Sequence, residues 1–191
     1  MKHEALLRHI RRYVELNEEE QDLIGVYSSI QEFRKKDFLL HLDQTCSAHF
    51  FVAKGCLRAF LINEKGQEQI TQFAIENWWI TNYDSLDNQI PSSLAIQAVE
   101  NTEVIRIHKN DYEMLLHKIP KLERYFRLVL QKAYGASQRR IQYIYTLSGE
   151  ERYHHFNESF PEFVQRIPQY MLASYLGFTP EFLSKIRAKK I

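Results

Sequence analysis

Cysteine is scarce in this chain, with only Cys46 and Cys56 among 191 residues. Two cysteines are too few for a disulfide framework and fit a reducing compartment. They are also fewer than the four that an iron–sulfur cluster normally needs. No apolar run is long enough to span a bilayer, and the N-terminus reads as charged and polar instead of as a signal peptide. We therefore expect a cytoplasmic protein with no membrane contact.

A large net charge is also lacking, since the formal value is +1, but the charge is unevenly distributed. Residues 1–120 hold 13 Lys and Arg against 18 Asp and Glu, a balance of −5. Residues 121–191 hold 12 against 6, a balance of +6. With 45% hydrophobic residues the chain is expected to fold into a packed globular protein. The basic C-terminal part is the expected binding region for a polyanionic partner.

Spacings typical of metal enzymes are missing from the predicted strands. A β-barrel oxygenase needs two histidines and a carboxylate on one rim, and the nearest pattern, His41-Leu42-Asp43, runs into a turn. Adjacent His154 and His155 lie on a predicted helix and point in different directions, so they are not expected to share a metal. No histidine spacing singles out a haem ligand. We predict no catalytic residue, no metal site and no cofactor, and classify the protein as not an enzyme.

The N-terminal part is predicted to be a β-structure flanked by helices. Helical spacing covers residues 3–16 and 18–27, and short apolar runs separated by turn signals follow from residue 29. Asn63–Gly66 is predicted to be a hairpin turn and residues 82–93 a loop. The predicted fold class is α+β with an antiparallel β-roll (double-stranded β-helix). The predicted strands are residues 38–42, 49–52, 57–62, 69–74, 94–99 and 104–107.

A short helix over residues 111–118 and a long helix from residue 120 to about 145 are predicted next. The long helix cannot bury its apolar stripe on its own, so it either lies across the β-domain or pairs with its copy from a second subunit. A further helix is predicted to run to about Ser159. The stripe consists of Leu122, Phe126, Val129, Leu130, Ala133 and Ala136.

The stretch from Pro168 to Lys190 predicts two short helices joined by a tight turn. Gly177 suits the end of the first helix, Thr179 suits the N-cap of the second, and Pro180 suits its first position. Small Ala173 lies where two steeply crossed helices would meet. This spacing is typical of a helix-turn-helix, whose second helix enters the major groove. An ordinary helical hairpin is the alternative. The stripe predicted to be buried on the second helix is Phe182, Leu183 and Ile186.

The order of these elements resembles the Crp/Fnr family of bacterial transcription regulators. The resemblance is carried by residues 165–170, 172–181 and 183–187 and, less specifically, by Gly55–Phe60. It implies a cyclic-nucleotide-binding-like effector domain over residues 1–118, a connecting and dimerisation helix over 119–146, and a helix-turn-helix domain over 147–191. It also implies a homodimer joined through the 120–145 helix, binding to double-stranded DNA at a pseudo-palindromic site, and contact with RNA polymerase.

The same resemblance implies which residues contact DNA. Many members begin the recognition helix with Arg-Glu and carry a second Arg four residues after the Glu; here Pro180 and Lys185 replace the arginines and Glu181 is retained. Glu181 can accept from cytosine N4, and Lys185 can donate to guanine without the fork of an arginine. Arg187, Lys189 and Lys190 are expected at phosphates. Many members also continue into a wing hairpin, and contacts of a wing with the DNA backbone are not among those expected here. The set is completed by Gln169, Thr179 and Ser184.

Relatives that bind cyclic nucleotides use a Gly-Glu and an Arg-Ser pair, but residues 75–95 contain neither Gly nor Arg. A buried phosphate would lack its charge partner, so we expect no response to cyclic nucleotide. Trp78 and Trp79 are expected mainly as core; with Ser92 and Ser93 they are the candidates to line a pocket for an unidentified small-molecule effector. The predicted function is a homodimeric, sequence-specific DNA-binding regulator. The alternative is a small-molecule-binding module with a weak or vestigial DNA-binding domain.

Overall fold

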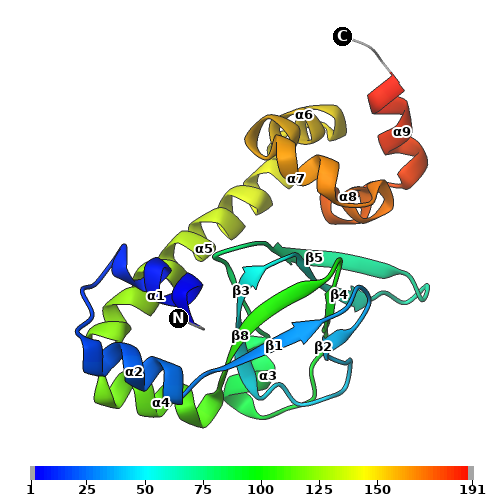
Figure 1. Ribbon diagram of the computed structural model, residues 1–191. Helices are drawn as coiled ribbons and strands as arrows, with labels where there is room; N and C mark the ends of the chain where they lie inside the picture. Colours follow the sequence, from blue (N-terminus) through cyan, green and yellow to red (C-terminus); the bar gives the residue numbers. More distant parts are fainter. Residues whose placement is uncertain (1–2, 189–191) are drawn as a thin grey trace. The chain divides into compact units, whose positions relative to one another are not determined.

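The computed structural model describes residues 3–188 and divides into two compact units. The first contains the residues up to Leu61 together with Gln72–Leu130, and the second contains Ile62–Thr71 together with the residues from Gln131 onward. The antiparallel sheets of the first unit and the helices of the second are drawn in Figure 1. The predicted α+β class with a C-terminal helical part is confirmed. The predicted domain boundaries at residues 118 and 146 stay a prediction.

Two helices precede the first strand, α1 (Glu4–Arg11) and α2 (Glu18–Val26). A capping box begins α2: the Asn17 side chain accepts from the Glu20 N–H at 2.9 Å, and the Glu20 carboxylate accepts from the Asn17 N–H at 2.8 Å. Both bonds satisfy N–H groups that a helix N-terminus leaves open. The prediction that residues 18–27 form a helix is therefore confirmed to within one residue.

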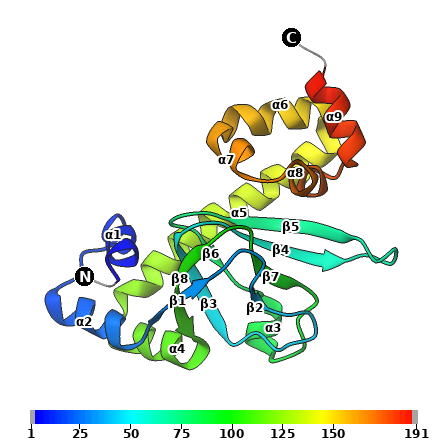
Figure 2. The same cartoon turned by 45° about the vertical axis from the view of Figure 1, so that its right-hand side comes forward.

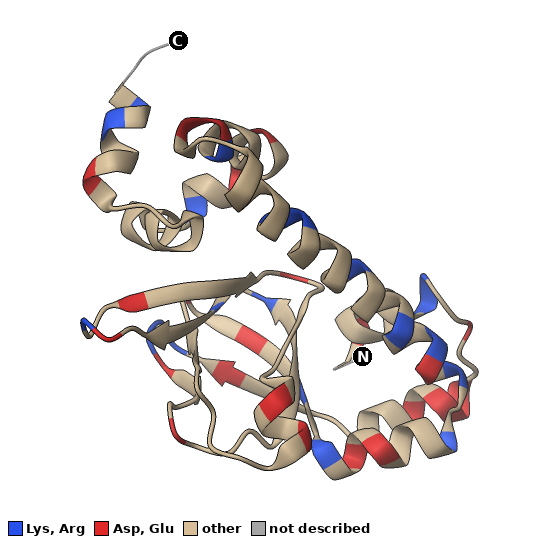
Figure 3. Ribbon diagram, turned by 180° about the vertical axis from the view of Figure 1, so that it is seen from behind, with Lys and Arg blue, Asp and Glu red and all other residues tan. Residues whose placement is uncertain are grey.

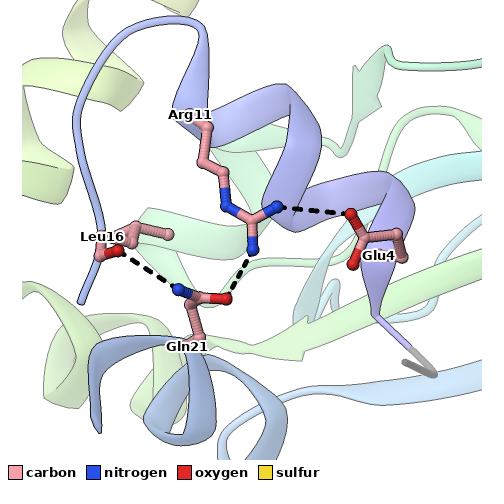
Figure 4. A network of polar contacts seen from close by, with 4 residues as sticks. All are labelled: Glu4, Arg11, Leu16 and Gln21. Carbon is pink, nitrogen blue, oxygen red and sulfur yellow. Dashed lines mark hydrogen bonds and ion pairs between the residues drawn. The ribbon is translucent and has the colours of Figure 1, made fainter. Parts of the chain in front are cut away.

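A polar network connects α1 to α2 (Figure 4). The Arg11 guanidinium donates to the Glu4 carboxylate at 3.3 Å and to the side-chain oxygen of Gln21. The amide nitrogen of Gln21 donates to the Leu16 carbonyl at 3.2 Å. The Arg11–Glu4 pair is exposed, so its contribution to stability is small. The network fixes the path of the chain between the two helices.

The strands of the described chain form two four-stranded antiparallel sheets, in the orders β1-β8-β3-β6 and β2-β7-β4-β5. Their register is regular in the long pairs: Phe51 lies opposite Ile105, and Ala59 lies opposite Ile96. The predicted β-roll is confirmed, with β1 and β6 added to the strands that the apolar runs indicated. The strands are β1 (Ser29–Phe33), β2 (Phe38–Leu40), β3 (Ala48–Lys54), β4 (Leu57–Ile62), β5 (Glu68–Ala74), β6 (Trp79–Ile80), β7 (Ala95–Ala98) and β8 (Thr102–His108).

Residues 82–93, predicted to be a loop, contain the short helix α3 (Tyr83–Asn88). Asn82 caps it by accepting from the Ser85 N–H at 3.3 Å, and the left-handed Gln89 ends it. The loop prediction is therefore wrong for Tyr83–Asn88, which are helical. Leu86, in the middle, packs into the roll with 1% of its surface exposed.

Alternating strand residues divide between two apolar cores. One core lies inside the roll and the other lies between the first sheet and the helices, so Phe50 enters the first core and Phe51 the second. Cys46 and Cys56 are both free thiols and both buried. The interior of the roll is filled by Leu40, Phe50, Val52, Leu57, Ala59, Ile80, Leu86, Ile96, Ala98 and Val104, among others.

The helices α4 (Lys109–Lys118) and α5 (Lys121–Thr146) complete the first unit and lead into the second. Leu122, Tyr125 and Phe126 of α5 are buried in the core that the helices share with the first sheet. The Tyr125 hydroxyl accepts from the Trp79 indole N–H at 2.8 Å and lies 2.8 Å from a ring nitrogen of His9. The beginning of α5 is thus held by both packing and hydrogen bonds.

Among the described residues of the second unit, four further helices follow α5 (Figure 2). Ser148 begins α6 with a capping box to Glu151, and Pro161 begins α7, a short helix that the sequence did not predict. The four are α6 (Gly149–Ser159), α7 (Pro161–Arg166), α8 (Gln169–Leu176) and α9 (Pro180–Ala188). Their buried residues are Tyr153, Phe163, Val164, Ile167, Met171, Leu172, Ala173, Leu183 and Ile186.

Candidate nucleic-acid interface

The turn between α8 and α9 has the geometry that the sequence predicted. Gly177 is left-handed at φ 79°. The Gly177 N–H donates to the Ser174 carbonyl at 3.2 Å, and the Phe178 N–H donates to the Ala173 carbonyl at 2.8 Å. These two bonds are the pair that defines a Schellman motif, which satisfies the last carbonyls of a helix. Gly177 is the residue that lets the chain leave α8 in this direction without strain.

Thr179 caps α9, since its hydroxyl accepts from the Phe182 N–H at 3.2 Å, and Pro180 is the first helical residue. Leu183 and Ile186 are buried between the helices, and Ala173 is completely buried. A larger side chain at residue 173 would overpack this crossing. The helix-turn-helix interpretation of these residues therefore matches the geometry in detail.

The prediction that Phe182 belongs to the buried stripe of α9 is wrong, because 44% of its surface is exposed. It lies at the flank of α9, with its ring centroid 5.3 Å from that of Phe178. The other neighbour is Gly149, where a Cβ would come within 2.6 Å of the Phe182 ring. Gly149 is a residue that sequence reasoning missed, because nothing local signals that its missing side chain makes room for a ring 33 residues later.

The side chains of Glu181, Ser184 and Lys185 form the exposed face of α9. At 100° per residue they lie on the side of the helix opposite Leu183 and Ile186, and all three are exposed. Figure 3 marks the acidic and basic positions along α9. The face therefore presents one carboxylate, one hydroxyl and one ammonium group within about one and a half turns.

The Glu181 carboxylate is held ionised by its place at the helix start. Its own backbone N–H and the Thr179 hydroxyl bond to it and lower the pKa of the Glu181 carboxyl below its usual range. An ionised carboxylate can only accept hydrogen bonds. It therefore matches an amino group on a base edge and repels a phosphate.

The remaining candidate DNA contacts lie at the ends of the helices. Gln169 is exposed at the first position of α8, and Arg187 is exposed in the last turn of α9. Lys189 and Lys190 lie outside the described residues. The structure thus brings Thr179, Pro180 and Gln169 to helix starts, where backbone N–H groups favour anions.

The four effector-pocket candidates occupy different settings in the first unit. Trp79 packs as predicted for core, with ring centroids 5.2 Å from Phe51 and 5.4 Å from Phe126, whereas Trp78 is 44% exposed. Ser92 is buried, and its hydroxyl accepts from Asn82 at 2.7 Å and donates to the Leu94 carbonyl at 2.6 Å. Ser93 is exposed. A pocket that gathers all four residues stays a prediction.

In residues 3–188 no group of three or more His, Cys, Asp and Glu side chains could hold a metal ion. No helix within the same range is long and apolar enough to cross a membrane.

The fold and this site define a class: a roll of the kind that binds cyclic nucleotides, combined with a helix-turn-helix unit. The family model for the cyclic nucleotide-binding domain matches residues 30–118. The chain is 26% identical over 185 residues to the anaerobic regulatory protein of Pasteurella multocida, an alignment covering 90% of this chain and 66% of the relative. It is 28% identical to the transcriptional regulatory protein btr of Bordetella pertussis, covering 78% and 65%.

Among solved structures, FixK2 from Bradyrhizobium japonicum superposes with a TM-score of 0.73 at 16% identity, covering 85% of this chain and 83% of that one. The likeness at this identity concerns the fold. The two relatives carry the names of regulatory proteins, and the chain is similar to them over most of its own length. The chain spans about two thirds of the length of the first curated relatives that it matches.

Proposed function

We propose that the protein is a homodimeric transcription regulator that binds a specific sequence in double-stranded DNA without responding to cyclic nucleotide. The observation that carries this proposal is the exposed face of α9, where Glu181, Ser184 and Lys185 stand opposite the buried Leu183 and Ile186. A helix of this length fits the major groove, whose base edges offer distinct donor and acceptor patterns. Similarity to relatives named as regulatory proteins supports the same function.

Each side chain of this face has a definite role in the proposal. The ionised Glu181 accepts from an amino group such as cytosine N4, and Lys185 donates to guanine O6 or N7. Ser184 lies between them and can donate or accept. Arg187 and Gln169 contact phosphates and set the position of α9. A single ammonium gives weaker discrimination than the forked arginine, so the preferred site is one with few guanine contacts for each subunit.

The dimer of this proposal is joined along the second half of α5. Leu130, Tyr134, Ile141 and Ile144 are exposed, and with Ser137 their steps of 4, 3, 4 and 3 follow a heptad repeat. Two such stripes from two chains bury each other in a short coiled coil. A two-fold dimer presents two copies of α9 and requires a pseudo-palindromic site. In the family such a dimer also contacts RNA polymerase, which we include in the proposal.

The effector side of the proposal concerns the roll. Its interior is filled by apolar side chains, and residues 75–95 supply neither an arginine nor a glycine for a phosphate. A buried phosphate without a cationic partner is strongly disfavoured. Cyclic AMP and cyclic GMP are therefore not the signal, and an unidentified small molecule is the remaining candidate effector.

The deciding experiment is selection of binding sites from a random duplex library, followed by affinity measurements with Lys185→Ala and Arg187→Ala. Lys185→Ala should lose about 1–3 kcal/mol on the selected site and relax the preference at one base pair. Arg187→Ala should weaken all duplexes alike and lower the salt dependence by about one phosphate contact. Lys118→Ala, an exposed lysine of α4, is the matched control. No enrichment of any duplex would reject the proposal and favour a small-molecule-binding module.

A further inference from the structure

The tip of the β4–β5 hairpin, residues Ile62–Thr71, belongs to the same compact unit as α8. The hydroxyl of Ser174 lies against the strand edge of this tip. It donates to the Glu68 carbonyl at 3.0 Å and accepts from the Ile70 N–H at 3.0 Å. Because β5 is the last strand of its sheet, these backbone groups face outward. One helical hydroxyl thus takes the place of a partner strand.

The same tip and α5 also reach the carbonyl groups at the C-terminal end of α8. The side-chain amide of Gln69 donates to the Ser174 carbonyl. The Arg140 guanidinium donates to the Tyr175 carbonyl at 2.8 Å and to the Thr71 carbonyl. Its guanidinium carbon also lies 4.1 Å from the centroid of the Tyr175 ring. Arg140 therefore joins the tip and the helix through a single side chain.

These contacts act on the turn that orients α9. The last carbonyls of a helix have no partner within it and must be satisfied by other groups. The Ser174 carbonyl that receives Gln69 is the one that receives the Gly177 N–H of the Schellman turn. The Tyr175 carbonyl, one residue further on, accepts from Arg140. The hairpin tip and Arg140 thus complete the end of α8 at the residues that begin the turn.

We infer that Gln69, Ser174 and Arg140 are positioning residues for DNA binding: the hairpin tip of the roll holds the helix-turn-helix turn in its binding geometry. None of the three needs to contact DNA. The inference rests on the proposed function, since it assigns the parts that hold the reading helix. Its consequence is that a disturbance of the β4–β5 hairpin reaches α9 through α8.

The test compares Gln69→Ala and Ser174→Ala with Gln67→Ala in the full-length chain. Gln67 lies on the same hairpin, and its side chain interacts with Asn63 instead of with α8. Ser174→Thr keeps the hydroxyl and serves as the conservative variant. On the duplex selected with the unaltered protein, both Ala variants should bind about tenfold more weakly, corresponding to about 1.4 kcal/mol. Gln67→Ala and Ser174→Thr should bind within about twofold of the unaltered protein by the same conversion.

Two further measurements separate positioning from loss of structure. Amide exchange should accelerate at Gly177 and Phe178 in the Ala variants while helical circular dichroism is retained. The salt dependence of binding should keep its slope, because no phosphate contact is removed. Unchanged affinity in both Ala variants would overturn the inference. Tighter binding by the Ala variants would also overturn it, because the contacts of the tip would then oppose DNA binding. If the unaltered protein binds no duplex, the proposed function fails, whereas unchanged exchange at Gly177 and Phe178 rejects the positioning role independently.

Discussion

The two halves of α5 both carry an apolar stripe, but in the described chain the first stripe is buried and the second is exposed. Leu122 and Phe126 in the first half are buried against the roll and its helices, whereas Tyr134 and Ile141 in the second are 67% and 54% exposed. A helix stripe of either kind requires a partner to be stable in water. This difference is the basis of the proposed dimer, in which the second half of α5 is covered by a second copy of the chain.

The largest effect is expected from Leu122→Ala in the covered half. Leu122 is 1% exposed, so its truncation leaves a cavity in the core around α5. The free energy of unfolding should fall by about 2–5 kcal/mol. Urea titration followed by tryptophan fluorescence measures this. The matched change in the uncovered half, Leu130→Ala, should lower the free energy of unfolding of the monomer by far less. Equal losses in the two variants would contradict the difference between the two halves.

The double change Ile141→Glu with Ile144→Glu tests the uncovered half. Both residues are exposed in the single chain, so folding should be retained. In the proposed dimer the carboxylates would face each other across an apolar seam, and association should weaken by about 3 kcal/mol or more. Sedimentation velocity should then show a monomer at concentrations where the unaltered protein is a dimer. Gln138→Glu with Gln142→Glu is the charge-matched control on the same helix, and dimers of the double variant would contradict the seam.

Acidification should lower the stability of the first unit, which contains the first half of α5, through His49 of β3. Burial lowers the pKa of His49 to about 4 from the usual 6.5, and its ring centroid lies 4.2 Å from that of Tyr112. Between these pH values His49 is therefore protonated in the unfolded chain and neutral in the folded chain. Stability is full above pH 6.5 and declines as pH falls toward 4, with a loss of about 2 kcal/mol by pH 5. Urea midpoints of the unaltered protein and of His49→Phe should diverge over this range; parallel curves would contradict the assignment.

The smallest effect concerns Gly135 in the uncovered half. A Cβ there would meet only the Arg139 side chain at 3.7 Å, an ordinary contact, and α5 continues through this residue. Gly135→Ala should therefore stabilise α5 by about 1 kcal/mol. Because residue 135 lies about 140° from the centre of the heptad seam, dimerisation should not change. A thermal melt at fixed concentration measures the gain, with Ala136→Gly as the reverse control.

Local chemistry in the sequence was enough for most of the elements. The Thr179 cap, the Gly177 turn and the Leu57–Ile62 strand occur where the residue types predict them, since each depends on neighbours within a few positions. The first strand, Ser29–Phe33, lacks an apolar run and was missed. Short α7 was also missed, because six residues give too little periodicity to recognise.

Other features of the candidate site depended on contacts far apart in the chain. Phe182 has the spacing of a core residue, but it lies at the edge of the stripe and only partly covers the space that Gly149 leaves. In the sequence Ser174 is an ordinary polar residue of a helix, and only the structure shows that its hydroxyl bonds to the edge of β5. Neither relation has a sequence signal, because the residues involved are separated by 33 and by more than 100 positions.

The sequence by itself determined the α+β class and the cap and turn of the helix-turn-helix, because period and capping act over one or two turns. Only the tertiary structure decided which part of the α5 stripe is covered, where Phe182 lies, and that the β4–β5 hairpin completes the end of α8. The physical reason is that burial and hydrogen bonding depend on which distant residues lie next to a side chain in the folded protein. The spacing of residues along a short stretch of sequence does not specify those neighbours.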